Sequence, residues 1–232
     1  MLKTTASRPA AVFMAMITAL ALLTGAIAVP ILCRPFYYAH IGPLELEAST
    51  GLTQGEIQTA FDQMLDYCQG RTDTFSTGVL PWSESGRSHF ADVRVLFQLD
   101  LQALVLSLGM LAGLGCLVWR GRLRPARLLG RGFSFWAGAG LAAVFLLVGS
   151  LAALDFDRAF TLFHALFFPG RDNWLFDPAQ DQIIRILPQV YFRNCALLIL
   201  ALLLLGCAAL IAADLLWAKR QARQRKKLVQ NS

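Results

Sequence analysis

The stretch CALLILALLLLGCAALIAADLLW, residues 195–217, decides the fold, because Asp214 is its only charged residue. At about 1.5 Å per residue, a helix of this length crosses the roughly 30 Å of hydrocarbon in a bilayer. Three similar runs, each free of Lys and Arg, lie at 10–32, 101–119 and 133–154. Because none of the runs shows the alternation of a membrane barrel strand, we predict an all-α integral membrane protein with four transmembrane helices.

The composition of the whole chain agrees with a membrane location. Of its 232 residues, 56% are hydrophobic and 16% are charged, a balance outside the range of ordinary soluble domains. We expect a single membrane domain over residues 1–232, with two longer connections at 33–99 and 155–194. Both connections are too short to bury a sizeable core alone, so we expect them to pack together and to contain short interfacial helices.

Charge predicts how the chain is oriented. Basic residues gather in three segments without acids: before the first span, in the 120–132 loop, and after the fourth span. By the positive-inside rule, both termini and this loop are cytoplasmic and the segments 33–99 and 155–194 are extracytoplasmic. The net charge of +6 is then a topology signal or a contact with anionic lipid, not a sign of nucleic-acid binding.

The first span has two interpretations. The start MLKTTASRP, the apolar core and Ala26-Ile27-Ala28 together resemble a cleavable signal peptide. The apolar run is longer than a usual signal core and continues to Leu32, so a retained anchor is preferred. Either choice leaves the same segments outside.

Within the first outer segment, Thr53-Gln54-Gly55-Glu56 has the pattern of a capping box. The apolar residues that follow at helical spacing are Ile57, Phe61, Met64, Leu65 and Cys68. We predict a short amphipathic helix, acting as a packing element. Cys33 and Cys68 both lie on the outer side, where a disulfide between them is permitted but not required.

All three histidines, His40, His89 and His164, lie in the outer segments. Histidine can both accept and donate a proton near neutral pH. His40 follows Phe36-Tyr37-Tyr38, so it can simply belong to an aromatic belt at the head-group level. His89 precedes Asp92 by three residues, a spacing that would bring the carboxylate beside the ring if the second long helix begins near Ser88.

His164 stands in the apolar stretch AFTLFHALFF, which we expect to prolong the third span outwards. Beyond it, Asp177-Pro178 has the pattern of a helix N-terminus, with Ile183, Ile184 and Leu187 facing inward. This arrangement would bring His89 and His164 together at the outer ends of neighbouring helices.

The segments SESGRSHFADVRVLF and FHALFFPGRDNWLFDPAQDQIIRILPQVYF closely resemble the paired signatures of the lipoprotein intramolecular transacylase family of four-helix bacterial membrane proteins. The first signature has His followed by Asp-Val, and the second has Phe-His, an aromatic run, Trp, Asp-Pro and a spaced Asp. The four-span plan extends the resemblance over essentially the whole chain.

The resemblance implies an acyltransferase of the bacterial cell membrane with its active site on the extracytoplasmic face. Its reaction moves the sn-2 acyl chain of a diacylated lipoprotein from the diacylglyceryl group to the α-amine of the N-terminal cysteine, giving a lyso-form lipoprotein. Carried over by motif position, His89 and His164 are the catalytic pair. Glu84 is a candidate partner, although Gly86 stands where a more helix-favouring residue is expected. Lipoproteins and membrane lipid are the implied partners, and no cofactor is needed.

The residues themselves fit this chemistry. Aminolysis of an ester needs a base for the amine and a proton for the departing alkoxide, and two histidines can share these tasks. The remaining candidates are supporting acids, oxyanion donors and an apolar berth for acyl chains: Asp92, Asp177 and Asp181; Arg94, Arg193 and Trp174; and Phe163, Phe167 and Phe168.

Two other classes of function remain open. A metal-dependent membrane hydrolase could use His89, Asp92 and His164 with Asp177 or Asp181 as ligands, because two His and two carboxylates suit zinc. The chain has no compact His-Glu-x-x-His motif, which disfavours this interpretation. A non-catalytic lipid-binding scaffold is the third candidate.

Overall fold

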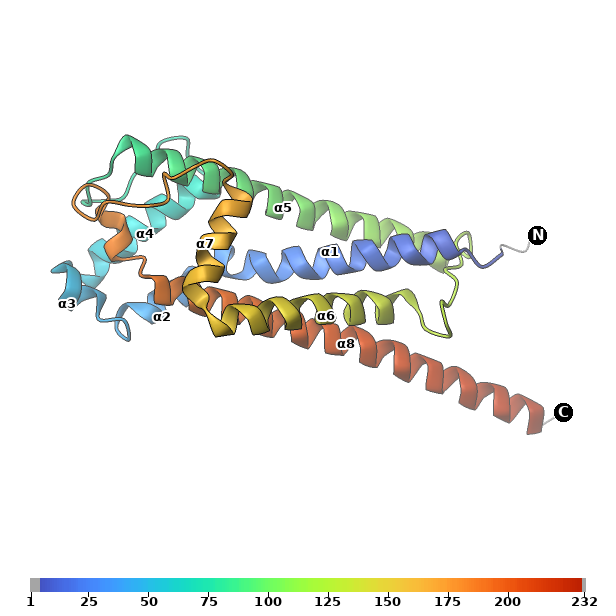
Figure 1. The fold of residues 1–232 in the computed structure, drawn as a ribbon. Helices are drawn as coiled ribbons and strands as arrows, with labels where there is room; N and C mark the ends of the chain where they lie inside the picture. The colour runs from blue at the N-terminus through green and yellow to red at the C-terminus, as the bar shows by residue number, and fades with distance from the viewer. Residues whose placement is uncertain (1–4, 231–232) are drawn as a thin grey trace. The chain divides into compact units, whose positions relative to one another are not determined.

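The structure is a computed structural model that describes residues 5–230, apart from the side chain of Arg225. Lys3, one of the basic residues before the first span on which the predicted orientation rests, lies outside this range. The described residues form helices and no strand beyond isolated bridges. Four helices are long and apolar enough to cross a membrane: α1 (Arg8–Leu32), α5 (Glu84–Trp119), α6 (Phe133–Leu154) and α8 (Gln189–Gln230) (Figure 1). Each expected apolar run lies within one of them, so the all-α class with four candidate spans is confirmed.

The chain divides into two compact units, and all four long helices contribute residues to both. The first unit contains the described residues up to 26, 103–149 and those from 200 onwards. The second contains residues 27–102 and 150–199, and with them every candidate site residue.

In the first unit, glycines allow close helix packing. A Cβ atom on Gly206 of α8 would lie 2.4 Å from a methyl carbon of Leu22 in α1. A Cβ on Gly138 of α6 would lie 2.8 Å from the carbonyl oxygen of Cys207 in α8. Large side chains such as Val105 and Leu147 remain mostly exposed. These apolar surfaces require lipid to cover them.

The acid inside the last apolar run has a structural role in the first unit. Asp214 is buried, and its carboxylate pairs with Arg127 at 3.1 Å and accepts a hydrogen bond from the Gly132 backbone N–H at 3.0 Å. The Arg127 guanidinium also lies 4.8 Å from the ring centre of Trp217. The pair therefore fastens the Arg-rich 120–132 loop to α8.

The second unit adds five short helices: α2 (Arg34–Ile41), α3 (Leu46–Thr50), α4 (Gln54–Cys68), α7 (Phe156–Phe167) and the 3₁₀ turn η1 (Gln182–Arg185). The capping box at Thr53 and Glu56 is present, which confirms the predicted start of α4. The five apolar residues predicted for this helix are all buried in one core cluster, where Tyr37 stacks on Phe61 at 3.6 Å. α4 is therefore a packing element.

The predicted extension of the third span through His164 is wrong. α6 ends at Leu154, Asp155 is extended, and α7 begins as a separate helix at Phe156. The Asp155 carboxylate accepts a hydrogen bond from the Arg158 backbone N–H at 2.9 Å. A side chain that caps a new helix in this way needs non-helical dihedral angles, so it interrupts the old one.

The predicted helix after Asp177-Pro178 is also absent. The Asp177 carbonyl accepts from the Asp181 N–H at 2.8 Å and its carboxylate accepts from the Ala179 N–H at 2.9 Å, closing a tight turn. Only the η1 turn follows, although Ile183 and Leu187 are buried as predicted. Asp177 satisfies its own backbone here, which is a common competitor of helix formation.

The Asp181 carboxylate joins this segment to the start of α5. It is buried, and it accepts hydrogen bonds from the Ser83 backbone N–H at 2.7 Å and from the Ser83 hydroxyl at 2.8 Å. The Ser83 hydroxyl in turn accepts from the Gly86 N–H at 3.0 Å, which caps the helix. A Cβ on Gly86 would lie 2.1 Å from the Asp181 Oδ1 atom, so only glycine leaves room for the carboxylate.

We therefore expect Gly86→Ala to destabilise the protein by about 1–3 kcal/mol, because the carboxylate must move out of its hydrogen bonds. The measurement is the apparent melting temperature of the purified protein in detergent.

Gly113→Ala, in the same helix, is the matched control, because nothing lies within 4 Å of its added Cβ. It should leave the melting temperature unchanged or raise it slightly. Equal melting temperatures for the two variants would contradict the crowding at Gly86.

Candidate active site

His164 faces inward from a helix whose other face is apolar. The ring is buried, with 6% of the residue exposed, whereas Phe163 and Phe167 are each 47% exposed and Leu162 and Leu166 more so. A soluble helix would have the opposite arrangement. The outward face of α7 therefore fits lipid or acyl chains.

The tautomer of His164 follows from its hydrogen bond. The Nδ1 atom lies 2.8 Å from the Phe160 carbonyl oxygen, which can only accept, so the neutral ring carries its proton on Nδ1. The lone pair is then on Nε2. The ring also stacks on Trp174, with the centroids 4.3 Å apart and the planes at 25°. Both contacts fix the direction of Nε2.

His89 projects from the start of α5, ahead of the apolar stretch at 101–119, and meets His164. The two ring centroids are 5.7 Å apart, and 6% of His89 is exposed. Phe168 and Phe176 lie edge-on to the His89 ring at 5.1 and 5.4 Å. The structure thus brings together the two histidines that the sequence analysis paired, inside an aromatic enclosure.

This enclosure keeps both rings neutral. Burial and the neighbouring His164 ring lower the pKa of His89 to about 4, against smaller opposite effects of Asp92 and Asn173. Burial also lowers the pKa of His164, while its hydrogen bond to Phe160 acts in the opposite direction. Two rings this close in an apolar site hold one proton between them far more readily than two.

Asp92 does not hold the His89 ring directly, as the spacing had suggested. Its Oδ2 atom accepts from the Asn173 amide at 3.0 Å, and its Oδ1 atom pairs with Arg171 at 3.4 Å. Asn173 therefore joins the site, although the sequence analysis did not single it out. Its place directly before Trp174 in the second signature was the available signal.

The other carboxylates have structural partners. Asp177 closes its own turn and Asp181 binds Ser83, as described above. Glu84 is exposed and pairs with Arg87, whose Nε lies 2.9 and 3.0 Å from its two oxygens. Within the part of the chain that the structure describes, none of the three bonds to either imidazole, so the partner role suggested for Glu84 gains no support.

The three candidate oxyanion donors differ in whether they contact the imidazoles. Arg94 donates to the Thr72 carbonyl at 2.8 Å and pairs with Asp73 at 2.7 Å, while its guanidinium covers the Tyr67 ring. Arg193 is exposed on α8. Trp174 stacks on His164, so it is the candidate donor that contacts one of the two proposed catalytic histidines.

The proposed acyl berth divides into two parts. Phe163 and Phe167 pack on each other at 4.7 Å and are half exposed on the outer face of α7. Phe168 is buried and touches both imidazoles, at 5.1 Å from His89 and 5.7 Å from His164. The Phe163 and Phe168 ring centroids lie 6.4 Å apart, so phenylalanines cover α7 from its outer face to the two imidazoles.

The permitted disulfide is not formed, because Cys33 and Cys68 are both free thiols. Cys33 is exposed. Cys68 is buried, and its Sγ contacts the Met64 sulfur at 3.8 Å and the Phe90 carbonyl at 3.9 Å. Burial raises the pKa of the Cys68 thiol to about 12, which leaves it unreactive.

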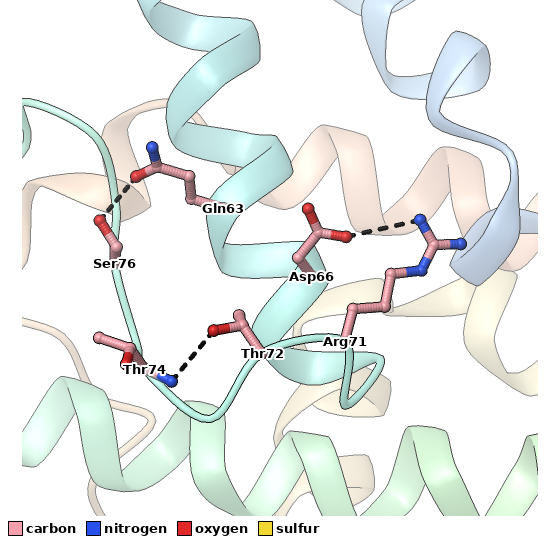
Figure 2. A pocket seen from close by; sticks show the side chains of 6 residues that line it. All are labelled: Gln63, Asp66, Arg71, Thr72, Thr74 and Ser76. Atoms are coloured by element: carbon pink, nitrogen blue, oxygen red, sulfur yellow. Dashed lines mark hydrogen bonds and ion pairs between the residues drawn. The ribbon is translucent and has the colours of Figure 1, made fainter.

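A polar pocket of about 530 Å³ lies elsewhere in the second unit, between α4 and the loop that follows it (Figure 2). Its lining residues are Gln63, Asp66, Arg71, Thr72, Thr74 and Ser76. They bond mainly to one another, as in the hydrogen bond of 2.6 Å from the Ser76 hydroxyl to Gln63. The pocket shares no residue with the histidine site and offers no reactive group.

Residues 5–230 contain no group of three or more His, Cys, Asp or Glu side chains placed to hold a metal ion. The ligand set considered for a hydrolase is not assembled in this range, since Asp177 and Asp181 are bound to other partners.

Comparisons with known proteins agree with the geometry. The model of the family described as lipoprotein intramolecular transacylase Lit matches residues 12–192. The solved structure of the membrane-integral transacylase Lit from Bacillus cereus is similar, with a TM-score of 0.81 and 23% identity over 94% of this chain and 97% of that one. A structure of the same protein with a histidine replaced by arginine has a TM-score of 0.77 and 21% identity, over 94% of each chain. No curated protein sequence matches the chain.

The low pKa of His89 predicts how stability depends on pH. The unfolded chain binds a proton at this position as the pH falls below about 6.5, whereas the folded protein does so only near pH 4. The free energy of unfolding should therefore decrease by about 1.4 kcal/mol per pH unit over this window. His89→Gln should remove this contribution, which thermal unfolding at pH 7 and pH 5 would reveal. An equal loss of stability in variant and wild type on acidification would contradict a buried neutral ring.

Proposed function

The chain belongs to the lipoprotein intramolecular transacylase family, and we propose that His89 and His164 catalyse its acyl transfer as a pair of general acid–base groups. The observation that carries this proposal is that two neutral imidazoles lie together in an aromatic enclosure, with their ring centroids 5.7 Å apart. The reaction moves the sn-2 acyl chain of the N-terminal diacylglyceryl-cysteine to that cysteine's α-amine.

The first step needs a base. An α-amine has a pKa near 8, so a substantial neutral fraction exists at the working pH, and its nitrogen can attack the ester carbonyl carbon. His164 is the better acceptor of the proton released on attack, because burial and the neighbouring ring lower the pKa of His89 to about 4. Its Nε2 atom would accept that proton.

The second step needs an acid. When the bond between the acyl carbon and the sn-2 oxygen breaks, the departing alkoxide takes a proton and becomes a hydroxyl group. An imidazolium buried among phenylalanines is more acidic than one in water, so it releases the proton readily. The amide bond has then formed, the ester bond has broken, and both rings are neutral again.

Proximity supplies much of the remaining rate acceleration. Donor ester and acceptor amine belong to the same molecule, so binding need only fold the substrate into a reactive conformation. The half-exposed Phe163 and Phe167 would hold the acyl chains, and Phe168 would exclude water at the rings. No cofactor is required by these steps.

The proposal includes a topology. Four spans form a single membrane domain in the bacterial cell membrane, with both termini and the 120–132 loop in the cytoplasm. Basic residues concentrated in those segments support this orientation. The segments 33–99 and 155–194 would then hold the active site on the extracytoplasmic side, where diacylated lipoproteins and membrane lipid meet it.

We expect His164→Gln and His89→Gln each to abolish the lyso-form lipoprotein, with a loss of about 100-fold or more in rate. The measurement is mass spectrometry of lipoprotein N-termini from a bacterial host that lacks this activity and expresses each variant at wild-type level in the membrane.

His40→Gln is the matched control. His40 also lies in the second unit and bonds the carbonyl oxygen four residues before it, Phe36 O at 2.6 Å, but its ring packs against Phe36 and Tyr191 instead of the other two histidines. It should retain the lyso-form product. Undiminished product with His164→Gln would contradict acid–base catalysis by this ring, and loss of product on chelation alone would indicate a metal-dependent reaction.

Trp174 tests how the His164 ring is held. Trp174→Phe keeps an aromatic surface under the imidazole but removes the indole N–H, whereas Trp174→Leu removes both. If stacking is the contribution, the Phe variant stays within about threefold of wild type and the Leu variant loses about tenfold, as a stacking energy of about 1.4 kcal/mol implies. Equal losses in both variants would assign the role to the N–H group as an oxyanion donor.

A further inference from the structure

Two buried polar atoms at the active site lack partners. Among the described residues, the His89 Nδ1 atom and the Asn173 Oδ1 atom are both buried without a hydrogen bond within the usual limits. Leaving a buried polar atom unpaired costs about 1–3 kcal/mol. One of the two can donate and the other can only accept, so each is the natural partner of the other.

The orientation of the Asn173 amide is fixed independently. Its Nδ2 atom lies 3.0 Å from the Asp92 Oδ2 atom and 3.4 Å from the Ser88 hydroxyl. An ionised carboxylate only accepts hydrogen bonds, so the NH₂ group must face Asp92 and the amide cannot be flipped. The carbonyl oxygen is therefore the atom left for the ring of His89.

We propose that Asn173 is a positioning residue, whose Oδ1 accepts the Nδ1 proton of His89 and thereby places the free lone pair of that ring on Nε2. The same tautomer is set in His164 by the Phe160 carbonyl. This inference rests on the proposed acid–base function of the pair. The small upward effect of Asn173 on the pKa of His89 agrees with an acceptor at this place.

The charged groups around His89 are compatible with this role. On its own helix, Asp92 faces it; from the segment after α7, Arg171 balances Asp92 at 3.4 Å; and from α7, His164 is neutral. Asp92 therefore acts through Asn173 instead of holding the ring itself. Arg171, Asp92 and Asn173 are linked in this order, and the proposed bond would extend the polar chain to His89.

The matched tautomers constrain the reaction. With Nδ1–H groups bonded to Asn173 and Phe160, neither neutral ring has an N–H available for the substrate. Two Nε2 lone pairs can instead accept hydrogen bonds from both N–H groups of a neutral primary amine, leaving the amine lone pair free for the ester carbon. The proton delivered to the sn-2 oxygen is then the one taken from the amine.

The test is ¹⁵N NMR of the full chain in detergent, with ¹⁵N-histidine incorporated and the signals assigned from His40→Gln and His164→Gln variants. The wild-type His89 should show the Nδ1–H tautomer. Asn173→Leu, which removes the acceptor, should convert it towards Nε2–H and lower kcat for a synthetic diacylated lipopeptide by about 100-fold, with little change in KM.

Gln180→Leu is the matched control, because this amide also donates to a carboxylate, Asp177 at 3.1 Å, in the same segment but has no ring partner. It should leave the tautomer of His89 and the activity unchanged.

An Nε2–H tautomer in wild-type His89, or an unaltered Nδ1–H tautomer in Asn173→Leu, would overturn the inference. Wild-type NMR alone decides the first point, even if the Leu variant does not fold. If the tautomers are as expected but His164→Gln remains active, the positioning role stands and the proposed catalysis fails.

Discussion

The arrangement of the active site depends on the hydrogen bonds that the buried Asp181 carboxylate accepts from Ser83. This carboxylate binds the backbone and side chain of Ser83 at the first turn of α5 and occupies the space above Gly86. His89 follows one turn later on the same helix. Asn173 and Trp174 precede Asp181 in the segment between α7 and η1. A buried carboxylate is costly to leave without its hydrogen bonds, so Asp181 holds these two parts of the chain in register.

Desolvation then determines the chemistry of the site. The buried aromatic side chains around the two imidazoles, among them Phe168, favour the neutral rings, because a charged ring is costly in apolar surroundings. The Nδ1 atom of His164 bonds the Phe160 carbonyl oxygen, and in the proposed mechanism the Nε2 atoms of both rings are left for the substrate. In the proposed mechanism, the apolar surroundings that could receive acyl chains also keep the imidazoles unprotonated, and a more polar pocket would favour the charged rings.

Much of the fold could be predicted from short-range patterns. The four spans follow from length and apolar composition, and the capping box at Thr53 predicted the start of α4. The wrong predictions concern two Asp side chains that accept hydrogen bonds from nearby backbone groups. Asp155 capped a new helix and interrupted the third span, and Asp177 closed a turn where a helix had been expected. Such short polar residues favour several local structures of similar energy, so packing decides between them.

The amino-acid sequence by itself determined that this chain crosses a membrane by helices and carries two histidines in paired signatures, since a lipid solvent responds only to length and hydropathy. Tertiary structure alone decided two long-range contacts of carboxylates: Asp181 binds Ser83, and Asp92 binds Asn173 in place of His89. Which long-range hydrogen bonds form depends on which polar groups the packed chain buries beside one another. No spacing in the sequence records that choice.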